Sequence, residues 1–162
     1  MIPDYEYGCA VTPTADLDLA VALRDAGLRV TSPRLAVLSE LTEGKHLTAD
    51  QVAVAVRGRL GTISIQAVYD VLAALTRAGL ARRIEPAGSP ARYETRVGDN
   101  HHHVVCRSCG AVTDVDCVVG EPPCVSPPDA SGFVIDEAEV TFWGLCPDCQ
   151  TTTKSNEKES AR

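Results

Sequence analysis

Two pairs of cysteines constrain this chain more than any other feature of its sequence. Cys106 and Cys109 form the first pair, Cys146 and Cys149 form the second, and 36 residues separate the pairs. Each pair can present two thiolates on one tight turn, and two such turns complete a tetrahedron of sulfurs. The spacing therefore predicts a closed structural Zn²⁺ site that joins two distant strands and supplies stability that a small β-rich domain lacks. A thioredoxin-like redox pair is the alternative, but it requires a βα unit and no second pair.

The other three cysteines are Cys9, Cys117 and Cys124. Six residues separate Cys117 from Cys124, so the two thiols can form a reversible disulfide or act as alternative metal ligands. Buried thiols without a function are the slightly favoured alternative, because free cysteine is often simply buried. The sequence leaves these alternatives open.

The residues before position 97 have the pattern of a winged helix. Apolar residues at helical spacing predict successive helices, with Thr31, Thr48 and Ser64 as N-caps. Two short strands, 81–84 and 91–95, follow the last helix and are joined by a turn. A helix-turn-helix followed by a β-hairpin can insert its last helix into the DNA major groove. A helical domain without a role in DNA binding has the same pattern.

The chain divides into four parts by composition. We expect a winged-helix domain at 1–96, a polar hinge at 97–100, a zinc-stapled domain at 101–150 and a disordered tail at 151–162. Within the third part, β-rich runs at 104–105, 112–115 and 133–145 predict strands, whereas the prolines between 120 and 131 exclude a long helix there.

The net charge of −7 conceals an asymmetry. Residues 16–96 carry 11 Lys and Arg against 9 Asp and Glu, a balance of +2, whereas residues 101–150 carry one Arg against 8 acids, a balance of −7. DNA affinity depends on local neutralisation of phosphates, so only the first segment suits DNA. The sequence has no apolar run long enough for a membrane span and no signal-peptide pattern at its start, so a cytoplasmic protein is expected.

A run of three histidines follows the hinge. Because side chains alternate in a strand, His101 and His103 share one face and His102 points to the other. Glu94, Asp114 and His46 are further nitrogen and oxygen ligands near this run in the predicted fold. Imidazole with carboxylate suits Fe²⁺, Mn²⁺ or Zn²⁺. A solvated polar junction is the competing interpretation of this cluster.

Longer motifs relate the chain to a known family. They are Arg29-Val30-Thr31-Ser32-Pro33-Arg34, Ser64-Ile65-Gln66-Ala67-Val68-Tyr69, Ala78-Gly79-Leu80, His101-His102-His103-Val104-Val105-Cys106-Arg107-Ser108-Cys109-Gly110 and Gly144-Leu145-Cys146-Pro147-Asp148-Cys149. With these motifs the chain resembles the ferric uptake regulator (Fur) family over roughly residues 17–150. Members are dimeric, metal-dependent transcription repressors, not enzymes. The resemblance implies an α+β fold, with an N-terminal winged helix and a small C-terminal α/β dimerisation domain, a homodimer, and double-stranded operator DNA as partner.

Further motifs point to one subgroup of this family. They are Gly98-Asp99-Asn100-His101-His102-His103, Asp114-Val115-Asp116-Cys117, Gly120-Glu121-Pro122-Pro123-Cys124 and Asp136-Glu137-Ala138-Glu139-Val140. They resemble the actinobacterial FurA/CatR-type repressors associated with catalase-peroxidase genes.

The resemblance implies roles for individual residues. The structural zinc is assigned to Cys106, Cys109, Cys146 and Cys149, and a regulatory Fe²⁺ or Mn²⁺ to His46, Glu94, His101, His103 and Asp114. The recognition helix is assigned to residues 64–78. The implied DNA contacts are Arg29, Arg34, Ser64, Gln66 and Tyr69, and the possible redox pair is Cys117 with Cys124.

Three departures from the family pattern affect these expectations. Many relatives have Thr and then Arg or Asn around the Val-Tyr of the recognition helix, where this chain has Ala67 and Asp70; Asp70 either faces away from DNA or accepts from a cytosine amine. Residues 136–139 lack the histidine that provides a third metal site in some relatives. The proline-rich segment 120–131 replaces a long helix, so a dimer built mainly from strands is expected.

The sequence therefore predicts a repressor that responds to metal and, from the subgroup, to peroxide. Loss of repression has two candidate routes, oxidation of a ligand histidine beside Fe²⁺ and oxidation of Cys117 or Cys124. An iron-availability or zinc-responsive regulator is the alternative. A thiol oxidoreductase lacks a nucleophile context, and a zinc-ribbon adaptor leaves the histidines unexplained.

Overall fold

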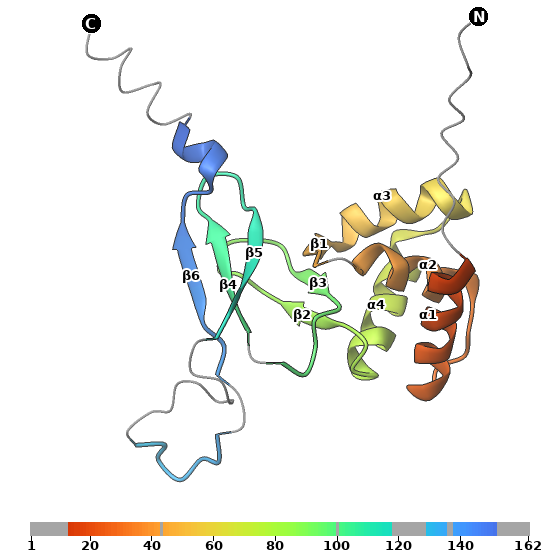
Figure 1. Ribbon diagram of the computed structural model, residues 1–162, viewed down its shortest axis with the longest axis horizontal. Coiled ribbons are helices and arrows are strands. Elements are labelled where there is room, and N and C mark those ends of the chain that lie inside the picture. The colour runs from red at the N-terminus through yellow and green to blue at the C-terminus, as the bar shows by residue number, and fades with distance from the viewer. Residues whose placement is uncertain (1–12, 43, 100, 118–128, 136–137, 152–162) are drawn as a thin grey trace, which may run out of the picture.

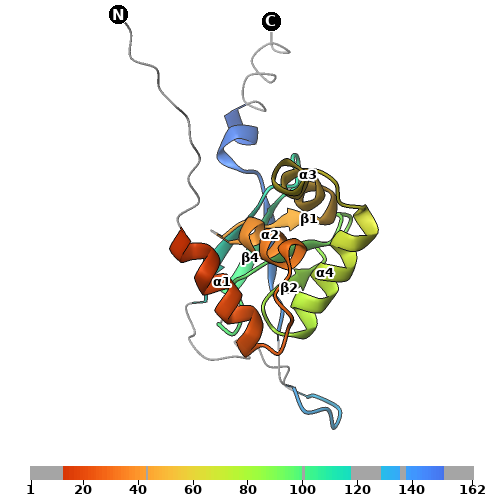
Figure 2. The same ribbon diagram turned by 90° about the vertical axis from the view of Figure 1, so that its right-hand side faces the viewer.

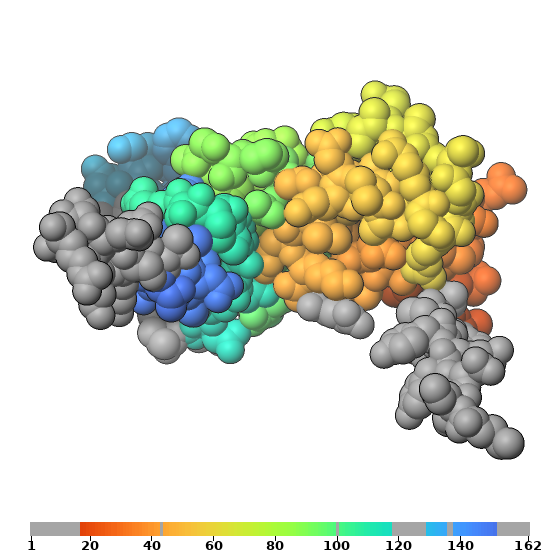
Figure 3. All heavy atoms as spheres, turned by 90° about the horizontal axis from the view of Figure 1, so that it is seen from above, coloured from red at the N-terminus to blue at the C-terminus, as the bar shows by residue number. Residues whose placement is uncertain are grey.

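The computed structural model describes residues 13–151 except 43, 100, 118–128 and 136–137. Two lobes lie side by side (Figure 1), with four helices and a small sheet in the first and a second sheet in the other. Seen from above (Figure 3), the red-to-yellow first lobe and the teal-and-blue second lobe occupy opposite ends of an elongated molecule. The α+β architecture expected from the sequence is confirmed. Cys9, Cys124 and the predicted tail beyond residue 151 lie outside the described residues.

Four helices build most of the first lobe, which faces the viewer in Figure 2. They are α1 (Pro13–Asp25), α2 (Ser32–Leu41), α3 (Ala49–Leu60) and α4 (Ile65–Arg77). The predicted caps are confirmed: the side chains of Thr31, Thr48 and Ser64 each accept a hydrogen bond from the backbone amide three residues later. Gln51 returns the bond of Thr48, which completes a capping box. These caps fix where α2, α3 and α4 begin.

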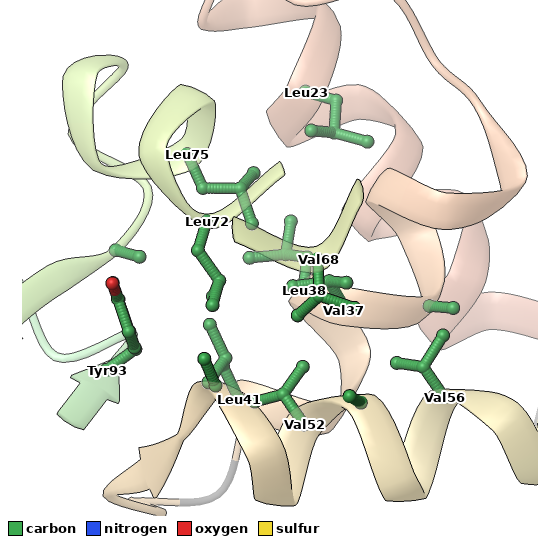
Figure 4. Packing of buried hydrophobic residues seen from close by; sticks show 14 residues of the cluster. Leu23, Val37, Leu38, Leu41, Val52, Val56, Val68, Leu72, Leu75 and Tyr93 are labelled. Carbon is green, nitrogen blue, oxygen red and sulfur yellow. The ribbon is translucent and has the colours of Figure 1, made fainter. Parts of the chain in front are cut away.

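The helices pack around one apolar core (Figure 4). Leu23 of α1, Leu41 of α2, Val52 of α3 and Leu72 of α4 are fully buried in it. Figure 4 also shows Tyr93, which reaches this core from the neighbouring strand. Because α4 buries one face in this core, its opposite face remains exposed to solvent.

The first sheet joins the helices to the second lobe. It has the order β1-β3-β2, with β1 (Leu47–Thr48), β2 (Arg82–Ile84) and β3 (Arg92–Glu94). All its pairs are antiparallel. The predicted hairpin of β2 and β3 is confirmed, but β1 was not predicted because two residues are too few for alternation to register.

The second sheet has the order β5-β4-β6. It consists of β4 (His101–Cys106), β5 (Val112–Asp116) and β6 (Thr141–Gly144), and β4 is antiparallel to β5 but parallel to β6. Among the described residues of the predicted strand at 133–145, only 141–144 form a strand, and 133–135, 138–140 and 145 do not. Phe133 and Val134 are 75% and 94% exposed and form no strand, since strand propensity needs a pairing partner to be expressed. A short helical turn at 147–151 follows β6.

No helix in the described part of the chain combines the length and the apolar character needed to cross a bilayer.

Candidate metal centres

Four side chains from both lobes converge between the two sheets. His46 precedes β1, Glu94 ends β3, His103 lies in β4 and Asp114 lies in β5. One nitrogen or oxygen atom of each lies within 4.8 Å of those of the others. His46, Glu94 and His103 are buried and Asp114 is half-buried. We call this set the regulatory cluster.

Strand register explains the convergence. In the second sheet His103 pairs with Asp114, so the two side chains stand next to each other on one face. In the first sheet Leu47 pairs with Tyr93. The same register extended by one residue brings His46 opposite Glu94. The two-residue strand β1 therefore positions one quarter of the cluster.

The atoms of the cluster have the spacing of a coordination shell. His46 Nε2 lies 2.7 Å from Asp114 Oδ1 and 2.9 Å from Glu94 Oε2. His103 Nε2 lies 3.3 Å from Glu94 Oε1 and 3.6 Å from Asp114 Oδ1. Ligands at about 2.0–2.2 Å from one ion are separated by about 2.8–3.6 Å in octahedral to tetrahedral geometry. Three of these four distances fall in that range, and the 2.7 Å contact between His46 and Asp114 lies just below it. His46 Nε2 and Asp114 Oδ1 are buried without a hydrogen-bond partner despite their short separation. Buried nitrogen and oxygen atoms this close together, without a hydrogen-bond partner, fit a divalent ion.

The charges of the cluster also favour a cation. Burial tends to raise the pKa of Glu94, but His103 and His46 together lower it to about 2. Burial likewise tends to lower the pKa of His46, but the carboxylates of Glu94 and Asp114 outweigh it and raise that pKa above its usual 6.5. The carboxylate of Glu94 is therefore ionised at neutral pH. The same two carboxylates thus favour a positive charge at the position of His46.

His101 lies beside this cluster rather than within it. Its Nε2 is 3.3 Å from Glu94 Oε1 and 3.9 Å from Asp114 Oδ1. Its Nδ1 lies 2.7 Å from the Asp99 carboxylate, the arrangement by which carboxylates commonly orient metal-binding histidines. His102 points to the other face of the sheet, as alternation predicts, with its ring centroid 6.1 Å from that of Phe142.

Arg96 holds the acidic groups behind the regulatory cluster. Its Nε is 2.5 Å from Asp99 Oδ2, its Nη2 is 2.5 Å from Asp116 Oδ1, and its Nη1 is 3.8 Å from Asp114 Oδ2. Asp99 and Asp114 in turn contact His101 and His46 through their other oxygens. One guanidinium thus orients two carboxylates that reach the histidines.

The four predicted zinc ligands also meet. The sulfurs of Cys106, Cys109, Cys146 and Cys149 lie within 4.8 Å of one another. The Cys109 and Cys146 sulfurs are 3.7 Å apart, close to the roughly 3.8 Å edge of a tetrahedron with Zn–S bonds of about 2.3 Å. We call this set the four-cysteine site.

The pKa values of these thiols favour a cation at the four-cysteine site. Backbone amides of Cys109 and Cys146 lower the pKa of Cys106 to about 6. The Ser108 hydroxyl tends to lower the pKa of Cys149, but the adjacent Cys146 and Cys109 thiols raise it to about 12. Four sulfurs this close cannot all ionise without a positive ion between them, so the residues fit zinc.

The predicted DNA contacts lie on the first lobe. Gln66 and Tyr69 are on the exposed face of α4, with Tyr69 45% exposed. Ser64 is occupied as the N-cap of that helix. Arg29 is exposed, whereas Arg34 is half-buried and donates to the Arg29 carbonyl at 2.8 Å.

Asp70 does not turn away from this face. It is exposed there and accepts from the Gln66 amide at 2.9 Å. Gln66, Tyr69 and Asp70 line a shallow groove together with Arg77 at the end of α4 and Arg83 of β2. Two arginines therefore flank the single carboxylate.

Sequence reasoning missed three residues that support these sites: Asp99, Arg96 and Arg92. Asp99 carried a usable signal, since residues two apart in an extended segment share a face with each other and it precedes His101 by two. Arg92 carried none, because His46 and Gly110 are distant from it in sequence. Arg96 is three residues from Asp99, but its contacts with Asp114 and Asp116 link distant residues. Cys117 is half-buried just beyond β5. The suggested redox pair remains a prediction, because Cys124 lies outside the described residues.

Comparisons with known proteins agree with this architecture. A model of the ferric uptake regulator family matches residues 25–122. The transcriptional regulator FurA of Mycobacterium tuberculosis is 59% identical over 138 residues, which cover 85% of this chain and 94% of that protein. Ferric uptake regulation protein 1 of Mycolicibacterium fortuitum is 62% identical over 127 residues, 78% of this chain and 79% of that protein. The ferric uptake regulator of Pseudomonas aeruginosa, solved with manganese, is 26% identical with a TM-score of 0.58, covering 80% of this chain and 98% of that one.

Replacing one cysteine of the four-cysteine site should remove both zinc and folding of the second lobe. In Cys106→Ser a closed tetrahedral site loses one thiolate, and zinc binding contributes about 10–16 kcal/mol in small zinc-dependent domains. Zinc content and circular dichroism measure the two effects. Cys117→Ser, outside the four-cysteine site, is the matched control and should keep one zinc per chain. A folded, zinc-free Cys106→Ser protein would contradict the assignment.

The stabilisation of the protein by Mn²⁺ should be larger at about pH 8 than at about pH 6. The pKa of His46 is raised in the folded metal-free protein, so this histidine stabilises that form below pH 6.5 and the effect is lost as the pH rises through the folded pKa. Mn²⁺ needs the neutral imidazole, so protons compete with it at low pH. Thermal unfolding with and without Mn²⁺ at both pH values measures the difference. An equal shift in melting temperature at the two pH values would contradict this account of His46.

Proposed function

The chain belongs to the ferric uptake regulator family, and from this membership we infer that it is a homodimeric repressor that binds operator DNA when Fe²⁺ or Mn²⁺ occupies the regulatory cluster. A transcriptional regulator, rather than an enzyme, is what the family and its close relatives imply. We further infer that its operators control peroxide-stress genes and that peroxide relieves the repression.

This proposal depends on one observation: the ligands of the regulatory cluster come from both lobes. His46 and Glu94 come from the first lobe, and His103 and Asp114 come from the second. An ion held by all four, with His101 beside them, fixes the orientation of the winged helix relative to the sheet. Nitrogen and oxygen ligands bind Fe²⁺ and Mn²⁺ reversibly, in contrast to the thiolates of the four-cysteine site. The manganese in the Pseudomonas aeruginosa relative supports the same choice of ion.

The structural consequence concerns the recognition helix. Helix α4, whose exposed face carries Gln66 and Tyr69, packs against β3, because Tyr93 of β3 shares the helical core with the buried residues of α4. Fixing Glu94 of β3 to the second lobe therefore fixes α4 as well. In a homodimer, this brings two recognition helices to two major-groove faces. A change from 1:99 to 99:1 in the competent population requires a preference of about 5.5 kcal/mol, which a multidentate ion can supply.

The chemistry near the cluster supports the peroxide response. Bound Fe²⁺ supplies redox activation of peroxide that Mn²⁺ does not readily supply. The rings of His46 and His101 lie 5.2 Å and 5.0 Å from that of His103, so three oxidisable imidazoles line the cluster. Transfer of one peroxide oxygen to an imidazole carbon, with release of the other as water, leaves a ring that binds metal less well. The motifs shared with repressors of catalase-peroxidase genes favour the same function.

Metal-dependent DNA binding tests the repressor proposal directly. His103→Ala should keep the fold and the zinc but lose most of the increase in operator affinity caused by Mn²⁺, because it removes a ligand from the regulatory cluster. His102→Ala, on the opposite face of β4, is the matched control and should retain most of that increase. Electrophoretic mobility shift or fluorescence anisotropy gives both affinities. Equal losses in the two variants would rule out this ligand assignment.

Peroxide should release the Fe²⁺-loaded protein from DNA and leave the Mn²⁺-loaded protein bound. Intact mass should rise by one oxygen atom under Fe²⁺ alone, and dithiothreitol should not reverse the change. A thiol mechanism differs on each point: it responds with either metal, is reversed by dithiothreitol and disappears in Cys117→Ser or Cys124→Ser. Persistent DNA binding under both metals, without modification, would replace peroxide sensing by iron-availability sensing.

A further inference from the structure

Strand β3 lies between the two lobes, and its successive side chains point alternately to one lobe and to the other. Tyr93 points into the helical core of the first lobe. Arg92 and Glu94, on the opposite face, both reach towards the second lobe. Glu94 belongs to the regulatory cluster, but neither metal site uses Arg92.

The guanidinium of Arg92 bridges two backbone carbonyls that are distant in sequence. Its Nη1 donates to the His46 carbonyl at 2.9 Å, and its Nη2 donates to the Gly110 carbonyl at 2.8 Å. Both bonds are partly buried, and Arg92 Nε is buried. A guanidinium presents such donors in a planar fork that a lysine ammonium cannot reproduce.

Each of these carbonyls belongs to the backbone of a metal site. His46 is itself part of the regulatory cluster. Gly110 follows Cys109 directly and closes the turn of the first cysteine pair, where its amide donates to the Cys106 carbonyl at 2.9 Å. Gly110 has φ +72°, the left-handed conformation that glycine adopts without strain. Arg92 thus connects the backbone that carries one predicted ligand with the turn that carries two others.

We propose that Arg92 is a positioning residue that couples the four-cysteine site to the regulatory cluster, so that an ion in either site favours occupation of the other. When both sites are filled, the carbonyls of His46 and Gly110 are held at the separation that the guanidinium spans. Loss of zinc releases the turn at Gly110 and removes one anchor of the His46 backbone. By linkage, Mn²⁺ at His46 must restrain the cysteine turn in return. This inference rests on the regulatory role proposed above for the cluster.

The coupling should be measurable, because each hydrogen bond contributes about 0.5–1.5 kcal/mol, which corresponds to about 2- to 12-fold in an equilibrium constant. A lysine at position 92 retains the charge but lacks the planar fork whose two nitrogens reach separate carbonyls. Its effect on coupling should therefore exceed its effect on the affinity of either site alone.

The test measures how Mn²⁺ protects the four-cysteine site in the full-length, zinc-loaded protein. N-ethylmaleimide alkylates a zinc-bound thiolate only when the site opens, so peptide mass spectrometry of Cys109 and Cys146 reports the opening. Saturating Mn²⁺ should slow this alkylation about 2- to 12-fold in the wild type. In Arg92→Lys the slowing should largely disappear, although zinc remains at one per chain. Arg83→Lys, on the neighbouring strand β2 and paired with Glu85, is the matched control and should behave like the wild type.

Direct Mn²⁺ titration by electron paramagnetic resonance separates the possible failures. If the wild type binds no Mn²⁺ at its histidines, the proposed function itself fails. If Mn²⁺ binds but does not slow alkylation of the wild type, or slows it equally in Arg92→Lys, only the coupling is overturned. Arg92→Met, which keeps the apolar stem without donors, replaces the lysine variant if that one does not fold. Failure of both to fold would assign Arg92 to folding and would also overturn the proposal.

Discussion

The burial of Glu94 beside two histidines is the interaction on which the relation between the lobes depends. A buried carboxylate is costly unless opposite charge or donors surround it, and here His46 and His103 lower its pKa to about 2. The partners come from different lobes, since His46 is attached to β1 and His103 to β4. Any rotation of the first lobe away from the second would separate Glu94 from His103. Compensation of one buried charge is therefore also a constraint on domain orientation.

The two metal centres differ in chemistry in a way that suits different tasks. Thiolates of the four-cysteine site join the end of β4 to the turn after β6, and the parallel register pairs Cys106 with Gly144. The described part of the second lobe has few buried apolar side chains, with Val105 and Cys106 among them. A tightly bound zinc ion can therefore supply stability that a small hydrophobic core does not. The regulatory cluster offers nitrogen and oxygen ligands, which release divalent ions more readily. The four-cysteine site stabilises the sheet β5-β4-β6, and that sheet carries His103 and Asp114 of the regulatory cluster.

Arginines mediate the contact between the lobes at two levels. Arg96 lies beside Asp114 of the regulatory cluster, where hydrogen bonds to Asp116 and Asp99 raise its own pKa. Arg92 connects the backbone of His46 to that of Gly110. Both are half-buried. Arg96 therefore supports the regulatory cluster through its carboxylates, and Arg92 supports it through the backbone of His46. Such outer contacts determine how accurately the ligands are held.

Much of the fold was predictable from local pattern. The caps Thr31, Thr48 and Ser64, the hairpin of β2 and β3, and the opposite orientations of His102 and His103 follow from side-chain chemistry and from the periods of helix and strand, which a short window contains. The four-cysteine site was equally accessible, because its ligands come in two close pairs. The predicted strand at 133–145 was too long, since apolar content does not reveal whether a pairing partner exists.

What the sequence determined by itself is thus most of the helices and strands, the zinc-type ligands and the histidine run. Only the tertiary structure decided how the groups from different strands and lobes meet. It brought His46 to Glu94 through a two-residue strand, placed His101 at the edge of the regulatory cluster beside Asp99, and set Arg92 between two carbonyls 64 residues apart. The physical reason is that these contacts depend on strand register and on the docking of one lobe against the other. Register and docking each depend on many weak interactions between residues that are distant in sequence, so a short segment of sequence cannot predict them.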